Sequence, residues 1–182
     1  FVNPPRKLAK LALKSIMANS NCHIYLGTIS PKHDYFPEFE SRITFLDLHD
    51  EAVDMGIDLV SSDYKTFDQD IFFKVVQLKW ILLKRVLSTS SIDFLVFTDL
   101  DVVWLRNPLP DLNILFERNH QINIAIQTYT NSPAKESLCM GFVAIRNNEE
   151  SLRIINECSN IHSDSLKNLT SRFGDDDAIS EY

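Results

Sequence analysis

Two aspartates, Asp99 and Asp101, are separated by one residue and follow closely after the apolar run FLVF at residues 94–97. The run predicts a buried strand of the kind found inside a parallel sheet. In an extended chain, residues i and i+2 project to the same side, so both carboxylates would face one point. Two like charges this close repel each other unless a cation lies between them or one carboxyl stays protonated. Because hard oxygen ligands on an open site suit Mg²⁺ or Mn²⁺ completed by a substrate phosphate, we predict a metal site at Asp99 and Asp101.

A local explanation of the same residues also stands. Two acids can simply solvate the exit of a strand, with Asn107 and Pro108 making the turn that follows. Turns favour aspartate because its side chain hydrogen-bonds the nearby backbone. The spacing of the two acids alone does not separate this explanation from a metal site.

The composition is that of a soluble globular protein. The chain has 182 residues, of which 45% are hydrophobic and 24% charged, so we expect a single domain over residues 1–182. The first residue is Phe1 and the last residues stop inside an apparent helix, which indicates a domain truncated at both ends. The net charge of −7 argues against a nucleic-acid partner. No apolar run reaches the roughly 18 residues of a membrane span, so no membrane contact is expected in this segment.

The order of elements predicts an α/β sheet with crossover helices. Apolar residues recur at helical spacing or in short runs, bounded by polar and proline-rich stretches. These patterns predict helices over residues 6–18, 71–87 and 111–118, a helix beginning after Asn147, and strands over residues 22–28, 43–48, 94–98, 122–127 and 139–146.

Four further features could contribute to a site. Lys79 lies in the helix that leads into the Asp99 strand, where it could approach a bound phosphate, although most helical lysines are solvated. Gly141, inside a strand, indicates either a close approach of a ligand or backbone, or a bulge. The acidic run Asp175-Asp176-Asp177 opens an apparent helix, where the dipole also favours acids. His162 is expected at the surface, within a loop over residues 159–172.

The sequence Thr98-Asp99-Leu100-Asp101-Val102-Val103-Trp104-Leu105-Arg106-Asn107-Pro108 resembles the signature of nucleotide-diphospho-sugar transferases related to glycosyltransferase family 77. The match is contiguous, which makes it far more specific than a bare pair of aspartates. Outside it, the resemblance includes Lys79 in the preceding helix, Gly141-Phe142 with Arg146, and the acidic run. It covers roughly residues 70–182.

This resemblance implies a GT-A fold, in which a Rossmann-like mixed sheet is flanked by helices, with Mn²⁺ or Mg²⁺ and a UDP-sugar donor. It implies transfer to a glycan or protein acceptor with retention of anomeric configuration, and residence in the Golgi lumen if the source is eukaryotic. In the implied site Asp101 binds the metal, and Asp99 ligates it directly or through water, towards the ribose. Lys79 binds the diphosphate or the donor sugar, and Gly141 lies close to the donor.

The resemblance also implies roles for three more residues. Asp176 and Asp177 would hold sugar hydroxyls or stabilise the cationic centre, and Asn3 falls where such folds place the nucleobase. Two positions depart from the family pattern, since Asp176 stands where glutamine is common and Ser180 where asparagine is common. A third protein ligand for the metal has no counterpart in the sequence.

Two alternatives to an active glycosyltransferase remain open. One is a catalytically inactive homologue that binds a nucleotide-sugar. The other is a haloacid-dehalogenase-like phosphatase, with Asp99 as nucleophile and Asp101 as general acid. Against the phosphatase, Val102 and Val103 stand where that family has Gly-Thr, and the motif lies far from the start of the chain.

Overall fold

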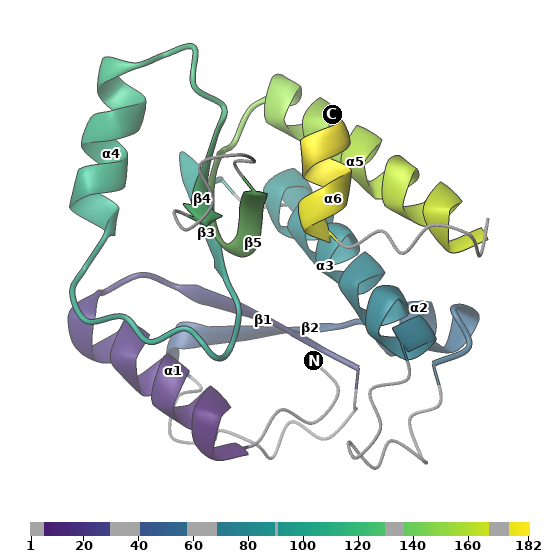
Figure 1. The fold of residues 1–182 in the computed structure, drawn as a ribbon. Helices are drawn as coiled ribbons and strands as arrows, with labels where there is room; N and C mark the ends of the chain where they lie inside the picture. The colour runs from purple at the N-terminus through teal and green to yellow at the C-terminus, as the bar shows by residue number, and fades with distance from the viewer. Residues whose placement is uncertain (1–5, 30–40, 58–68, 90, 130–136, 168–174) are drawn as a thin grey trace.

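The computed structural model describes residues 6–29, 41–57, 69–89, 91–129, 137–167 and 175–182 (Figure 1). The elements in these ranges are α1 (Arg6–Asn19), β1 (Ile24–Thr28), β2 (Ile43–Asp47), α2 (His49–Asp54), α3 (Gln69–Thr89), β3 (Phe94–Thr98), α4 (Leu109–Arg118), β4 (Ile124–Tyr129), β5 (Ser137–Arg146), α5 (Glu149–Lys167) and α6 (Asp175–Glu181).

The strands form two sheets of different kinds. β1 and β2 pair in parallel, from Ile24 opposite Ile43 to Thr28 opposite Asp47. The second sheet has the order β3-β5-β4, and both of its pairings are antiparallel. The predicted mixed α/β architecture is confirmed. The expectation that β3 lies inside a parallel sheet is wrong for the described residues, because its partner there is the antiparallel strand β5.

The long helix α3 packs between the two sheets, which explains why apolar residues occupy most of its circumference (Figure 1). On one side, Trp80 and Leu83 join a core that includes Met140 of β5 and Ile155 of α5. On the other side, Leu78, Leu82 and Val86 join a second core with Ile29, Leu48 and Ala52. Burying a side chain of this size stabilises the fold by about 1.5–3 kcal/mol, so α3 is fixed from both sides.

Helix α5 corrects two sequence-based expectations. The segment expected as a loop from residue 159 is helical as far as Lys167, and His162 is fully buried rather than exposed. Ile155, Cys158 and His162 follow each other at spacings of three and four, which places them on one face of the helix. The pattern escaped prediction because that buried face also carries the polar residues Ser159 and His162.

The start of α5 also differs from expectation by one residue. The side-chain Oδ1 of Asn148, rather than Asn147, accepts the Ser151 N–H at 2.8 Å and caps the helix. The short helix α2 was not predicted. Within the described residues, no helix combines the length and the apolar character needed to cross a membrane.

Candidate functional site

The segment that carries Asp99 and Asp101 is a turn. Strand β3 ends at Thr98, the Asp99 N–H donates to the Gly141 carbonyl at 3.0 Å, and the Val102 N–H donates back to the Asp99 carbonyl at 3.2 Å. The extended geometry assumed from the sequence is therefore wrong. The two carboxylates still interact, because the charge of Asp101 is one of the causes that raise the pKa of Asp99. Asp99 is partly buried, and Asp101 is exposed.

Lys79, from the middle of α3, reaches this turn. Its Nζ lies 3.4 Å from Asp99 Oδ1 and donates a hydrogen bond to Asp175 Oδ2. It also lies 4.8 Å from the centre of the Phe97 ring, within the range of a cation–π contact. Only 9% of the Lys79 side chain is exposed. Lys79 is thus not the solvated lysine that most helical lysines are, and its approach to a bound phosphate remains a prediction.

The pKa shifts describe one cation among several acids. Burial opposes the charge on Lys79, but the carboxylates of Asp175 and Asp99 together raise the pKa of Lys79 above its usual value. Burial is the main cause that raises the pKa of Asp99; the charges of Asp175 and Asp101 add to it, and Lys79 opposes it. One ammonium therefore does not balance the negative charge around it, and the surplus favours binding of a further cation.

The three consecutive acids at the start of α6 have three different environments. Asp175 is buried and pairs with Lys79. Asp176 Oδ1 accepts the Met140 N–H at 2.5 Å, and burial raises the pKa of Asp176 despite that hydrogen bond. Asp177 is exposed. The predicted contacts of Asp176 and Asp177 with the donor sugar remain predictions.

Asp175 is the site residue that sequence reasoning did not single out. The acidic run was a visible signal, but the sequence could not tell which of its three members faces Lys79. The orientation is set by the next turn of α6, where Ala178 is fully buried in the core beside Met140.

Both alternatives offered for Gly141 have support in the structure: it lies where the β4–β5 register shifts between Val143 and Cys139, and its carbonyl accepts the Asp99 N–H at 3.0 Å. A Cβ atom added there would lie 3.4 Å from Asp99 Oδ2 and 3.4 Å from the Sγ of Cys139. The group that approaches Gly141 is thus the Asp99 side chain, while the Gly141 carbonyl holds the Asp99 backbone. Asn3, predicted at the nucleobase, lies outside the described residues.

The donor atoms fit a hard divalent cation. Asp99 Oδ1 is buried and has no hydrogen-bond partner among the described residues, although the Lys79 ammonium lies 3.4 Å from it. Asp101 places a second carboxylate two residues further on. No group of three or more His, Cys, Asp or Glu side chains in the described residues is arranged to hold a metal ion. A site with one or two carboxylates leaves positions for water and substrate phosphate, as Mg²⁺ sites commonly do.

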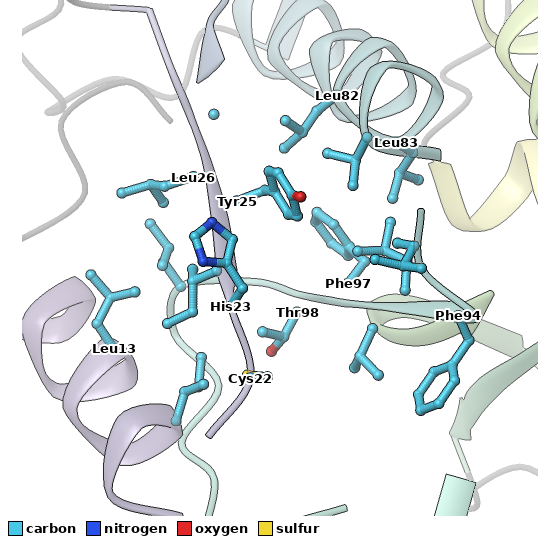
Figure 2. A pocket seen from close by; sticks show the side chains of 18 of the residues that line it. Leu13, Cys22, His23, Tyr25, Leu26, Leu82, Leu83, Phe94, Phe97 and Thr98 are labelled. Carbon is cyan, nitrogen blue, oxygen red and sulfur yellow. The ribbon is translucent and has the colours of Figure 1, made fainter. Parts of the chain in front are cut away.

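A separate cavity of about 270 Å³ lies between β1 and β3 (Figure 2). Leu13 of α1 and Leu82 and Leu83 of α3 line it together with the residues of both strands. Lys79 and the carboxylates described above are not among its lining residues. The polar site is thus at the end of β3, outside this apolar cavity.

Charged groups from α3, from the turn after β3 and from the start of α6 gather beyond the carboxyl end of β3 in this α/β domain. Residues 40–178 match the family model of nucleotide-diphospho-sugar transferases, and the chain belongs to that family. The matched range contains Lys79, Asp99, Asp101, Gly141 and the acids of α6 up to Asp177. No curated protein and no solved structure matched the chain. The family makes this chain a glycosyltransferase that uses a nucleotide-sugar donor.

Proposed function

We propose that the chain is a metal-dependent glycosyltransferase that moves a sugar from a UDP-sugar to a glycan or protein acceptor, with retention of configuration. The resemblance to the family 77 signature around Asp99 supports the donor and the stereochemistry. The observation that carries the metal dependence is the buried Oδ1 of Asp99, which has an ion pair with Lys79 at 3.4 Å but no hydrogen bond among the described residues, beside an incompletely balanced group of acids. The cation would be Mn²⁺ or Mg²⁺.

The chemistry requires control of negative charge. Transfer breaks the bond between the anomeric carbon and the diphosphate, so charge grows on the leaving group while the sugar becomes oxocarbenium-like. A divalent ion held by Asp99 and Asp101 supplies Lewis-acid stabilisation of the diphosphate. Lys79 stays protonated at neutral pH because Asp175 and Asp99 raise its pKa, so it adds a fixed positive charge beside the same group.

The acids of α6 act on the sugar side of this proposal. Asp176 accepts a hydrogen bond from the Met140 N–H of β5, and the next residue, Asp177, is exposed. In the proposed complex they bind donor-sugar hydroxyls or stabilise the positive charge that develops at the anomeric carbon. Gly141 has no side chain, which leaves room beside it for the Asp99 carboxylate.

The proposal is tested by calorimetric titration of UDP into the protein with Mn²⁺ and then with a chelator. We expect binding that requires Mn²⁺ and weakens at least about tenfold in Asp101→Asn. Asp111→Asn is the matched control, because Asp111 is an exposed acid of α4 that pairs at 2.9 Å with Arg106, which precedes the helix. Equal binding in wild type and Asp101→Asn would contradict the metal site.

Turnover is measured separately, as UDP released from a panel of UDP-sugars with and without acceptor glycans. Release from one donor would identify the sugar. Metal-dependent UDP binding without release from any donor would instead support the inactive nucleotide-sugar-binding homologue. Phosphatase activity that depends on Asp99, in the absence of UDP binding, would support the haloacid-dehalogenase alternative.

A further inference from the structure

We propose that Asp175 is a positioning residue of the donor site, which acts through Lys79 and keeps Asp99 available to the metal. This inference rests on the proposed function, since it assigns a role within the same site. Asp175 itself is placed neither on the metal nor on the sugar. Asp175 instead determines the position of the Lys79 ammonium group.

The contacts show a lysine shared unequally between two acids. Lys79 Nζ is hydrogen-bonded to Asp175 Oδ2, while its distance to Asp99 Oδ1 is 3.4 Å. Asp99 Oδ1 makes no hydrogen bond among the described residues, although it is buried. Asp175 therefore holds the ammonium closer than Asp99 does, and Asp99 Oδ1 keeps only the longer ion pair with Lys79.

Asp175 can exert this pull because its own position is fixed. It stands at the first residue of α6, and that helix packs against β5 and α5 (Figure 1). The buried Ala178 anchors the helix one turn later, and the hydrogen bond from the Met140 N–H to Asp176 anchors it at the next residue. A lysine side chain loses considerable rotamer freedom when it is held, and a fixed acceptor reduces the further loss on ligand binding.

Loss of the Asp175 charge would change the partner of Lys79. With asparagine at position 175, the remaining nearby carboxylate is that of Asp99, and an ammonium moves towards the stronger negative charge. Lys79 would then tighten its existing ion pair with Asp99 and compete with Mn²⁺ for the same oxygen. The variant should therefore lose metal-dependent UDP binding even though the Asp99–Asp101 turn is unchanged.

The test is a double-mutant cycle of Asp175→Asn and Lys79→Met, measured as UDP binding in the presence of Mn²⁺. We expect Asp175→Asn to weaken UDP binding by at least about tenfold in the wild-type background and by less than about twofold in the Lys79→Met background. Asp175→Glu, which keeps the charge, should recover part of the affinity. Asp164→Asn is the matched control, because Asp164 pairs with Lys167 at 2.9 Å on the exposed side of α5.

The same cycle is measured on the free energy of unfolding without Mn²⁺ or UDP, which reports the ion pair independently of function. Coupling in both measurements supports the role of Asp175. If the two substitutions are coupled in the free energy of unfolding but their effects on UDP binding are additive, Asp175 is only a structural partner of Lys79, and the inference is overturned. If Asp175→Asn does not fold, the cycle is run with Asp175→Ser, which also removes the charge, and an unchanged UDP affinity in that variant overturns the inference. Failure of the wild type to bind UDP would instead refute the proposed function.

Discussion

Replacing Lys79 with methionine should destabilise the protein strongly and in a pH-dependent way. Methionine keeps the length and apolar stem of lysine but removes the charge that lies between Asp99 and Asp175. Side-chain exposure is 9% for Lys79, 12% for Asp175 and 29% for Asp99, so water replaces the lost ammonium poorly. The variant leaves two nearby carboxylates without their common partner.

The magnitude follows from the burial of the pair. Removing one partner of a buried ion pair costs about 3–5 kcal/mol. Because Asp99 is partly exposed, we expect the lower end, about 3 kcal/mol at pH 7. For a chain of this size, 1 kcal/mol shifts the unfolding midpoint by about 2–4 °C, so Tm should fall by about 6–12 °C.

The pH dependence has a definite sign. In wild type the pKa of Asp99 is already raised, chiefly by burial, and the charge of Lys79 opposes that rise. Without Lys79 the pKa of Asp99 rises further. A carboxyl whose pKa is raised by folding stabilises the folded state more as the pH falls through that pKa. The loss caused by Lys79→Met should therefore be largest near pH 7 and shrink towards pH 5.

Urea unfolding at pH 7 and pH 5 measures both effects. Lys167→Met is the control, since the side chains of the Lys167–Asp164 pair are 71% and 68% exposed and such pairs contribute roughly 0–1 kcal/mol. A loss below about 1 kcal/mol at pH 7 in Lys79→Met would refute the reasoning on burial. An equal loss at both pH values would refute the reasoning on Asp99.

Two further predictions concern the turn after β3. Asp99→Asn removes a partly buried charge, so it should raise the free energy of unfolding of the metal-free protein by about 1 kcal/mol at pH 7. The same variant should lose Mn²⁺-dependent UDP binding. A variant less stable than wild type in urea would contradict the raised pKa of Asp99. Gly141→Ala places a methyl group 3.4 Å from Asp99 Oδ2 and from Cys139 Sγ. Gly141→Ala should change the free energy of unfolding by less than about 1 kcal/mol and weaken Mn²⁺-dependent UDP binding several-fold. An unchanged UDP affinity in calorimetry would show that the orientation of the Asp99 side chain is not critical for binding.

Much of the secondary structure could be predicted because the signals are local. The apolar run of β3 and the helical spacing in α1 and α3 have few competing interpretations. The short helix α2 was missed, and the second half of α5 was mistaken for a loop. In α5 the buried face includes Ser159 and His162, and burial of polar residues depends on partners that lie elsewhere in the chain.

The pairing of β3 could not be predicted for a similar reason. Its apolar residues fit a strand of either kind of sheet, and the choice depends on which strand lies beside it. The structure supplies β5, which runs antiparallel and brings Gly141 to Asp99. A glycine inside a strand predicted either a close approach or a bulge at Gly141, but the sequence could not show that Asp99 lies beside it.

The sequence by itself determined that two aspartates follow a buried strand, that a lysine lies in the helix before them, and that three acids open a helix near the end. These features depend on neighbours along the chain. Only the tertiary structure decided that Asp175, 96 residues from Lys79, is the acid that meets it. The physical reason is packing: burial of Ala178 against β5 sets the rotation of α6, and that rotation turns Asp175 towards Lys79 and leaves Asp177 exposed.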